Sequence, residues 1–250
     1  MPLARPDKLQ TLAAYAYAHR GLHGDGVPEN ALAAFRAAMA AGFGIECDIR
    51  KSSDGRAVVF HDAELERLTG RAGAMGARSV GDLTAIKLTG SEETIPTLRD
   101  TLDLVAGKVP LLLEVKSDDR RPVDAICRAV RRDLDGYQGL AAVMSFDPRV
   151  PRWFAEHEPD VLRGLVVSEQ DSRTLMAAIK RKLSVAHARP DFLALDVRDL
   201  PSSLARKQAA KGRALFSWTL RSAAQLETAL RSGAVPILEG AGVAAWEAGA

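Results

Sequence analysis

Residues 30–49, NALAAFRAAMAAGFGIECDI, run from an amphipathic helix pattern directly into a buried strand pattern. In Asn30–Ala41, an N-cap at Asn30 and a stop at Gly42 bracket apolar residues at helical spacing, namely Leu32, Phe35 and Met39. Gly44–Ile49 then reads as a strand whose apolar positions are interrupted by two carboxylates. A helix followed closely by such a strand is the repeating unit of a parallel α/β sheet.

The same alternation continues along the chain. Further helix patterns cover Thr97–Ala106, Pro122–Leu134 and Ser222–Arg231. Short apolar runs predict strands at Ala14–Ala18, Gly44–Ile49, Ala57–Phe60, Leu111–Val115, Ala141–Met144, Leu162–Val167, Phe192–Leu195, Ala214–Trp218 and Val235–Leu238. A chain of 250 residues has the typical length of a (β/α)8 barrel, about 250 residues. We therefore predict an α/β fold of this type.

The organisation of this barrel is expected to be simple. We predict a single domain over residues 1–250, because no repeat, linker or low-complexity tract divides the sequence. The nine candidate strands exceed the eight places of the barrel, so one of them is expected to lie outside it. The glycine-rich segment Gly70–Gly81 is expected to be a surface excursion of the domain.

Composition excludes several classes of protein. A net charge of +2 provides no bulk field for nucleic acid or an anionic membrane surface. Two cysteines, Cys47 and Cys127, exclude a disulfide framework and suit a reducing compartment. The first residues, MPLARPDKLQTLAAYAYAHRG, lack the apolar core of a signal peptide or membrane span. We expect a soluble cytoplasmic protein without membrane insertion; the sequence leaves its oligomeric state open.

Charged residues inside the predicted strands point to a site. Glu46 and Asp48 are two residues apart, so both carboxylates lie on one face of their strand, and Glu114 and Lys116 share this spacing. Three carboxylates that converge in a strand interior require a cation or protonation. An all-oxygen ligand set favours Mg²⁺ or Ca²⁺ over Zn²⁺.

Histidines and further cations end neighbouring strands. His19 and Arg20 end the first predicted strand, and His61 follows a Val-Val-Phe run. In a parallel barrel these ends share one rim, where such barrels place active sites. Histidines beside a cation suit acid–base chemistry near neutral pH, and Arg20 and Lys116 suit a phosphate. Each residue also has a structural interpretation, and the Glu114–Lys116 pair could be an ion pair within one strand.

Several motifs in this order resemble one family, the glycerophosphodiester phosphodiesterases of the phospholipase C-like phosphodiesterase superfamily. The specific matches are His19-Arg20-Gly21, Pro28-Glu29-Asn30, Glu46-x-Asp48, Asp54-Gly55 and His61-Asp62. Weaker matches follow at Ile95-Pro96-Thr97-Leu98, Leu113-Glu114-Val115-Lys116, Ser145-Phe146 and Phe216-Ser217-Trp218-Thr219. The resemblance therefore extends over most of the chain and implies a (β/α)8 barrel.

The resemblance also implies residue roles. Glu46, Asp48 and Glu114 would bind the divalent cation, Mg²⁺ or Ca²⁺. His19 and His61 would be the catalytic acid–base pair. Arg20 and Lys116 would contact the phosphate of a small-molecule glycerophosphodiester, and Trp218 would line the substrate entrance. The implied reaction yields glycerol 3-phosphate and an alcohol, in lipid and glycerol metabolism.

The chain departs from the family pattern near its end. Arg221 stands where the family usually has Asn, and Gly233–Gly240 lacks both usual Asp residues, with Glu239 and Gly240 at its end. These changes lie at strand ends that would frame the substrate. Arg221 could favour a more anionic substrate or pair with Glu239.

Two other functions fit the same residues. One is a lysophospholipase D-like or cyclic-phosphodiester activity, which an exposed apolar loop at the rim would favour; the sequence contains no clear example. The other is a non-catalytic phosphate-ligand binder, which the presence of both His19 and His61 disfavours, since a binder needs no proton-transfer pair.

Overall fold

The structure, a computed structural model, describes residues 4–117, 122–170 and 174–249. It contains two compact units, in which unit 1 comprises Met1–His19 with Ala142–Ala250 and unit 2 comprises Arg20–Ala141. Both units combine strands with helices, as the alternating sequence patterns predict.

The strands of unit 1 form a parallel sheet in the order β5-β6-β7-β8-β9-β1. Their bounds are β1 Tyr17–His19, β5 Ala141–Ser145, β6 Leu162–Val167, β7 Phe192–Asp196, β8 Ala214–Leu220 and β9 Ala234–Leu238. The register pairs Asp196 with Trp218, so the carboxyl ends of neighbouring strands lie side by side. Polar residues at those ends are therefore brought together by the parallel arrangement.

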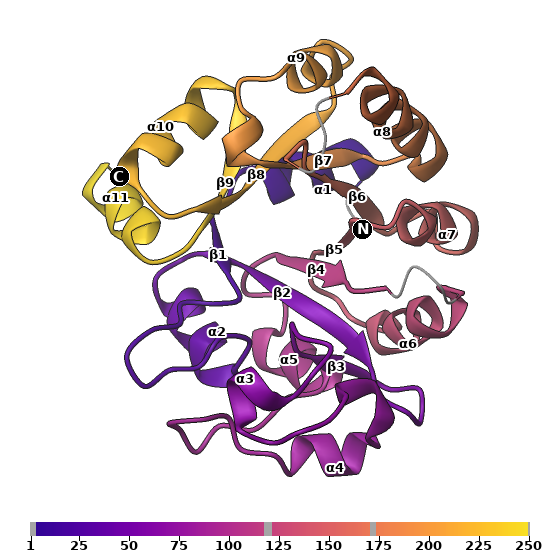
Figure 1. Ribbon diagram of the computed structural model, residues 1–250. Helices are drawn as coiled ribbons and strands as arrows, with labels where there is room; N and C mark the ends of the chain where they lie inside the picture. Colours follow the sequence, from indigo (N-terminus) through magenta and orange to yellow (C-terminus); the bar gives the residue numbers. More distant parts are fainter. Residues whose placement is uncertain (1–3, 118–121, 171–173, 250) are drawn as a thin grey trace. The chain divides into compact units, whose positions relative to one another are not determined.

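Helices cover the outside of the unit 1 sheet (Figure 1). The outer helices are α7 Arg149–His157, α8 Leu175–Ala188, α9 Ser203–Ala209, α10 Ala223–Arg231 and α11 Ala241–Gly249. Unit 1 also contains α1 Arg5–Ala13 and the short 3-10 helix η2 Val197–Asp199. Aromatic rings pack between the strands: the ring centroids of Tyr17 and Phe216 are 5.8 Å apart, and those of Phe192 and Phe216 are 4.7 Å apart. These fully buried rings fix the core of the unit.

Unit 2 shows which of the nine predicted strands is additional to the eight of a barrel. Strand β2, Gly44–Lys51, pairs in parallel with β4, Leu111–Val115. Strand β3, Ala57–Val59, instead pairs antiparallel with the end of β2 through a tight turn that contains Gly55. The predicted strand Ala57–Phe60 is therefore a hairpin extension of β2, since it runs against the parallel direction.

The helical part of unit 2 contains α2 Leu32–Ala40, α3 Glu66–Thr69, α4 Val80–Thr84, α5 Leu98–Val105 and α6 Asp124–Leu134, with the 3-10 helix η1 Met75–Ala77. Met75, Leu83 and Ile86 are buried in one apolar cluster with Val58 and Phe60. The segment Gly70–Gly81, predicted to be a surface excursion of the domain, is also tied to the interior, because Met75 packs in this cluster with Val58 of β3. Val80, in the same segment, also packs against this cluster. The many glycines around Met75 and Val80 hide this apolar pattern in the sequence.

Local sequence explains the helix ends, with one correction. Thr97 caps α5 through a reciprocal capping box with Asp100. The N-cap of α2 is Ala31, and not Asn30 as predicted. Asn30 adopts a left-handed backbone conformation, with φ of 58°, and its side chain points to β2. The Asn30 side chain therefore forms hydrogen bonds with Asp48 of β2 and does not cap the N-terminus of α2.

None of the helices within the described ranges has the length and apolar content needed to traverse a lipid bilayer.

Candidate functional site

Three carboxylates form a buried cluster in unit 2. Glu46 and Asp48 extend from β2, and Glu114 extends from β4, where the register pairs it with Asp48. One ligand atom from each residue lies within 4.8 Å of the others. Their exposed fractions are 1%, 0% and 7%, respectively. Such a set of buried oxygens is suited to a hard divalent cation.

Positive groups and an amide surround Asp48. Its Oδ2 atom lies 3.0 Å from Nε of Arg20, and its Oδ1 atom lies 2.9 Å from Nζ of Lys116. Asn30 donates from Nδ2 to Oδ2 at 2.9 Å and accepts from the backbone N–H of Asp48 at 3.2 Å. Burial alone would raise the pKa of Asp48, but Lys116 and Arg20 lower it well below its ordinary value. Asp48 is therefore held in its ionised form.

Glu46 has the opposite electrostatic character. Its Oε2 atom accepts from the backbone N–H of Arg20 at 3.1 Å. Burial, together with the neighbouring charges of Asp48 and Glu114, raises its pKa well above the ordinary value. A divalent cation among the three carboxylates would reverse this shift, because it replaces repulsion by attraction. The residues present therefore fit a cation of the Mg²⁺ or Ca²⁺ type.

Lys116 lies against this cluster. Its ammonium group forms ion pairs with both Asp48 and Glu114. The ion pair within one strand that the sequence left open is therefore present, and it extends to the neighbouring strand. Burial lowers the pKa of Lys116, but the two carboxylates outweigh it and raise that pKa above its ordinary value.

His61 is oriented by a chain of charged side chains in unit 2. Its Nδ1 atom lies 2.6 Å from Asp62, which accepts from Nε of Arg67 at 2.6 Å. Arg67 also pairs with Glu29, and Glu29 accepts from Arg20 at 2.8 Å. Burial lowers the pKa of His61 below its ordinary value. With Nδ1 bound to Asp62, proton exchange on this ring is directed to Nε2.

A hollow of about 420 Å³ lies beside these groups in unit 2. Its lining includes Arg50, Lys51 and Lys116, together with apolar side chains such as Met75 and Ile126. Arg50 donates from Nε to the backbone carbonyl of His61 at 2.6 Å. Glu64 also lines the hollow, so three cations stand against one carboxylate, and this excess of positive charge favours an anionic ligand.

His19 has an equivalent partner in unit 1. Its Nδ1 atom lies 2.7 Å from Oε2 of Glu239, which follows strand β9. Arg221 donates two hydrogen bonds to the same carboxylate, from Nε at 3.0 Å and from Nη2 at 2.8 Å. Burial would raise the pKa of Glu239, but hydrogen bonds from His19 and Arg221 lower it to about 2. Glu239 is thus a fixed anion that orients the His19 ring.

Trp218 lies near the carboxyl end of β8 in unit 1. Its indole N–H donates to the backbone carbonyl of Ala194 at 3.0 Å. The ring meets Phe146 edge-on, with centroids 5.4 Å apart and planes at 78°. Phe146 is 48% exposed, so the pair forms an aromatic surface at this end of the sheet.

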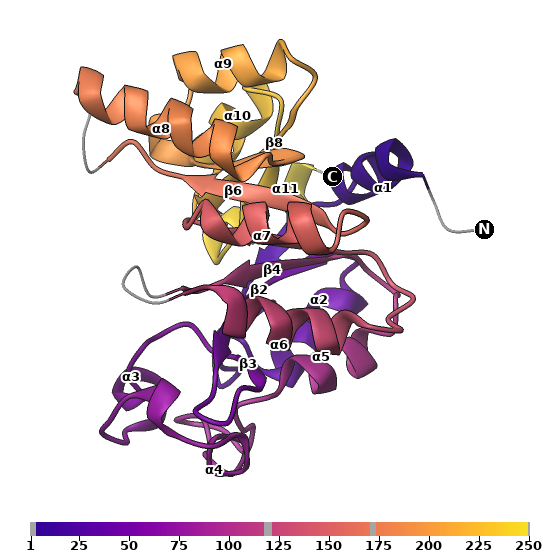
Figure 2. The ribbon, with the colours of Figure 1, turned by 90° about the vertical axis from the view of Figure 1, so that its right-hand side faces the viewer.

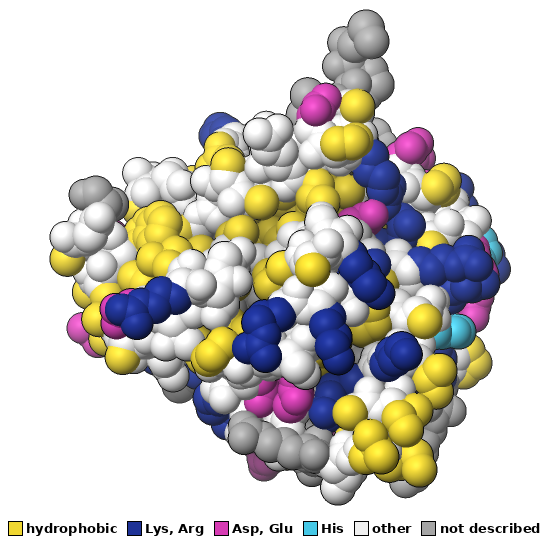
Figure 3. Space-filling model, turned by 90° about the horizontal axis from the view of Figure 1, so that it is seen from above, with side chains coloured by type: hydrophobic (Ala, Val, Ile, Leu, Met, Phe, Trp, Pro, Cys, Tyr) yellow, Lys and Arg dark blue, Asp and Glu magenta, His cyan; other side chains and the backbone are white. Residues whose placement is uncertain are grey.

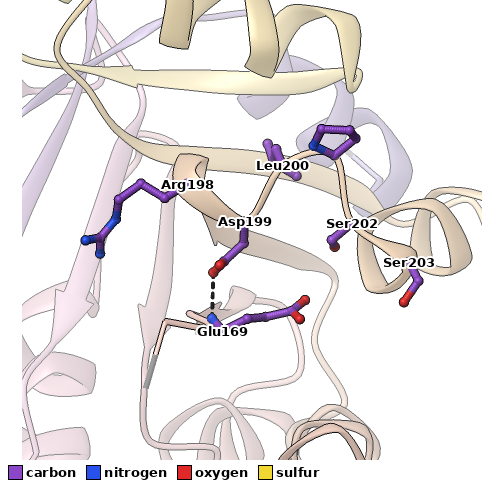
Figure 4. A pocket seen from close by; sticks show the side chains of 7 residues that line it. Glu169, Arg198, Asp199, Leu200, Ser202 and Ser203 are labelled. Carbon is purple, nitrogen blue, oxygen red and sulfur yellow. Dashed lines mark hydrogen bonds between the residues drawn. The ribbon is translucent and has the colours of Figure 1, made fainter. Parts of the chain in front are cut away.

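A second hollow in unit 1, of about 400 Å³, lies between the segments that follow β6 and β7. Figure 4 shows Asp199 directed at the backbone of Glu169, whose N–H it accepts, while Arg198 points away. Arg198 instead pairs with the buried Asp196. These carboxylates have structural partners, and we assign the hollow no chemical role.

The predicted site residues are thus divided between the units. Unit 2 brings six of them into one network: Arg20, Glu46, Asp48, His61, Glu114 and Lys116. Unit 1 contains His19 and Trp218.

The sequence matches the model of a known protein family. The model of the glycerophosphoryl diester phosphodiesterase family matches residues 19–239. The chain belongs to this family. The match begins at His19 and ends at Glu239, so it includes both members of the unit 1 contact described above.

Curated relatives agree over part of their length. The glycerophosphodiester phosphodiesterase of Caldanaerobacter subterraneus is 36% identical over 110 residues, which are 40% of this chain and 44% of that protein. Human glycerophosphodiester phosphodiesterase 1 is 29% identical over 160 residues, 60% of this chain and 48% of that protein. The matched part therefore spans about half of the curated relatives.

A solved structure shows the fold. A phosphodiesterase of Oleispira antarctica, in complex with the product sn-glycerol-3-phosphate, superposes with a TM-score of 0.80 at 22% identity. The alignment covers 93% of this chain and 95% of that one. The fold is the (β/α)8 barrel of the family, as the sequence predicts.

Several residues contribute to the site through contacts that the sequence patterns do not predict. The sequence pattern predicts a helix cap at Asn30, and it predicts that Glu239 frames the substrate or pairs with Arg221, without indicating a contact with His19. Arg50, on β2, is not among the residues that the sequence predicts for the site. The signal for Asn30 was its place in the Pro28-Glu29-Asn30 motif, but its contact with Asp48 depends on a left-handed backbone that sequence patterns do not reveal.

Proposed function

We propose that this protein hydrolyses glycerophosphodiesters to glycerol 3-phosphate and an alcohol, with a divalent cation and histidine acid–base catalysis. The observation that carries the proposal is the cluster of Glu46, Asp48 and Glu114 in a chain of this family. Buried carboxylates are costly unless they are paired or bind a cation. Lys116 offsets part of this cost, and a cation would offset the remainder.

The carboxylates would hold Mg²⁺ or Ca²⁺, which when bound supplies Lewis-acid stabilisation of charge on the phosphoryl oxygens. Arg20 and Lys116 would bind the phosphate, because both already lie against Asp48, and Lys116 also lines the cationic hollow of unit 2. Each must share its charge between Asp48 and the substrate. Arg50 would add a third positive charge on the substrate side.

The two histidines would transfer protons. One ring accepts a proton from water or from the glycerol hydroxyl of the substrate as a new P–O bond forms. The other donates a proton to the leaving alkoxide as the original P–O bond breaks. When the glycerol hydroxyl attacks, water subsequently opens the cyclic product. Nδ1 of each ring is bound to a carboxylate, which supports Nε2 as the transferring atom in both.

The cytoplasm is the proposed location, and lipid and glycerol metabolism the proposed setting. Cys47 and Cys127 are both buried and not joined in a disulfide, which suits a reducing compartment. The substrate is a small molecule, and no feature of the net charge calls for nucleic acid.

A second candidate is lysophospholipase D-like hydrolysis on the same groups. Exposed apolar side chains at the start of α8 favour it, since Leu175 and Met176 are 78% and 73% exposed. A substrate with an acyl chain would find an apolar surface there. The test below therefore includes such a substrate.

The direct test is product release from glycerophosphocholine, glycerophosphoethanolamine and a lysophospholipid, with Mg²⁺ or Ca²⁺ and with a chelator. We expect glycerol 3-phosphate from the first two, and none with the chelator. His61→Ala should abolish turnover. If folded, cation-loaded protein cleaves no diester while His61→Ala binds glycerol 3-phosphate as wild type does, the protein is a non-catalytic binder.

A further inference from the structure

The outward face of α8 is apolar. Leu175, Ile179 and Leu183 recur every four residues, and their exposed fractions are 78%, 44% and 65%. Met176, which is 73% exposed, lies beside them. At 100° per residue these four side chains fall within about a quarter of the helix circumference. The helix therefore presents an apolar stripe to its surroundings, defined here as the α8 stripe.

The inward face of α8 already supplies buried apolar residues, which makes the stripe unusual. Val185 and Ala188 are buried against unit 1, on the side of the helix opposite the stripe. Packing within the unit is thus already satisfied by those residues. The stripe must contribute to something other than the core, because an ordinary surface helix is polar on its outer face.

The stripe is concentrated on one helix. Six large hydrophobic side chains are exposed among the described residues, and four of them form the stripe. The other two, Phe146 and Leu230, lie on separate elements. Scattered single apolar residues are normal on a surface, whereas a contiguous group marks an interaction site. Figure 3 shows hydrophobic side chains gathered close to Lys and Arg on one face.

Lysines flank the stripe on both sides. At helical spacing, Lys182 follows one edge of the stripe and Lys180 follows the other, and both are exposed. Arg181 lies on the inner side, where it pairs with Glu169 at 3.4 Å. The helix contains no Asp or Glu between Leu175 and Ala188. An apolar stripe bordered by lysines is the pattern of a helix that lies in a lipid interface.

The position of α8 suits such a surface. The helix begins a few residues after β6 ends at Val167, so Leu175 and Met176 lie toward the carboxyl end of the unit 1 strands. Trp218 and Phe146 lie at the same end. In both views α8 lies at the periphery of unit 1 (Figures 1 and 2). A surface bound to the stripe would thus lie near the end of the sheet where barrels bind substrates.

We propose that the α8 stripe docks this protein peripherally on an anionic phospholipid surface, with Lys180 and Lys182 at the level of the headgroups. The four apolar side chains enter the interface and the lysines neutralise lipid phosphates. The docking stands apart from the proposed hydrolysis, since it requires no turnover.

A second copy of the chain fits the stripe less well. Pairing two α8 helices would bring their lysines together with no acid on either helix to compensate. Four side chains are also few beside the roughly 20–30 residues that each partner contributes to a stable interface. Charge therefore favours lipid over a second copy.

The test is co-sedimentation with vesicles of phosphatidylcholine alone or mixed with phosphatidylglycerol. We expect binding to the mixed vesicles, weakened at least tenfold by Leu175→Ser/Leu183→Ser. Lys180→Gln/Lys182→Gln should weaken it about fivefold for each lysine removed, and salt should weaken it further. Hydrolysis of soluble glycerophosphocholine should be unchanged in both variants, so that a failure of docking is distinguished from a failure of the activity.

Matched controls are available in the same chain. Leu230→Ser removes an exposed leucine of α10, and Lys108→Gln removes an exposed lysine of unit 2. Neither should change vesicle binding, and all variants should keep the wild-type melting temperature. Binding that survives both double variants, or that Leu230→Ser weakens equally, overturns the proposal. So does a wild-type dimer in light scattering that Leu175→Ser/Leu183→Ser converts to a monomer.

Discussion

Nδ1 of His19 and Oε2 of Glu239 are 2.7 Å apart, although the two residues are separated by nearly the whole sequence. Glu239 is one of the departures from the family pattern, and it replaces neither of the usual Asp residues in position. Arg221, a second departure, holds the same carboxylate. The two departures thus act together: Arg221 holds the Glu239 carboxylate, and this carboxylate orients the ring of His19. The side-chain contact of Arg221 in this structure is with Glu239.

Glu239→Gln should slow hydrolysis more than it weakens substrate binding. The amide cannot compensate an imidazolium, and it can present an N–H where the ring requires an acceptor. We expect kcat to fall roughly tenfold to a hundredfold with little change in KM, as for other carboxylates that orient a functional histidine. Steady-state kinetics with glycerophosphocholine measure both constants. Glu227→Gln, in an exposed ion pair on α10, is the matched control; an equal loss there would refute the assignment.

The Glu239 carboxylate should also make stability depend on pH. Its pKa falls from the ordinary 4.5 to about 2 in the folded protein. The unfolded chain therefore binds the proton first as pH falls, and the stabilisation is present above about pH 4.5 and lost toward pH 2. Wild type should exceed Glu239→Gln in unfolding free energy by about 1 kcal/mol at neutral pH, allowing for solvent screening.

Urea unfolding of both proteins from neutral pH to about pH 3 measures this difference. The difference should shrink across the acidic part of that range. A difference that is constant with pH would show that the carboxylate is not held in its ionised form by His19 and Arg221.

Asn30 should stabilise Asp48 through its side chain and not through its backbone alone. Asn30→Gly keeps the left-handed conformation accessible but removes two buried hydrogen bonds to Asp48, which should cost roughly 1–3 kcal/mol of unfolding free energy. Asn30→Ala should cost about 1 kcal/mol more, because φ of 58° disfavours a Cβ. Chemical denaturation compares the three proteins. If Asn30→Gly is as stable as wild type, the contact with Asp48 contributes nothing.

Gly21, next to Arg20, should tolerate no side chain. Its φ is 80°, and a Cβ there would lie 2.8 Å from Cβ of Ala34 and 2.9 Å from the ring of Phe35. Gly42 has a similar φ of 76° but open space around it. We expect Gly42→Ala to cost roughly 1–2 kcal/mol from backbone strain. Gly21→Ala should cost 1–3 kcal/mol beyond that from overpacking. Equal losses in thermal unfolding would mean that α2 can move away from Gly21.

The sequence predicted the strands and four of the helices, α2, α5, α6 and α10, because its strands are apolar and these helices are amphipathic. It could not place the ninth strand, since the run Ala57–Phe60 is as apolar as a barrel strand and only its pairing with β2 reveals its direction. Glu46, Asp48 and Glu114 were predictable because buried strand carboxylates are costly. Asn30 and Glu239 were not, because their roles depend on a left-handed backbone and on a contact over the length of the chain.

The net charge of the whole chain did not predict the α8 stripe and its flanking lysines. A net charge of +2 gave no reason to expect an anionic surface as partner. The stripe on α8 could not be predicted from composition, because it depends on Leu175, Ile179 and Leu183 lying on the outer side of the helix. Apolar residues at helical spacing do not reveal by themselves which face of a helix is buried.

The central claim is that Glu46, Asp48 and Glu114 bind one divalent cation that hydrolysis requires. Calorimetric titration of Mg²⁺ or Ca²⁺ into chelator-treated protein, with diester hydrolysis assayed at each point, tests it most directly. We predict one bound ion per chain, activity that rises with occupancy, and loss of both in Glu46→Gln/Glu114→Gln but not in the exposed control Glu92→Gln. Full activity without a bound ion, or undiminished binding in the double variant, would contradict the account.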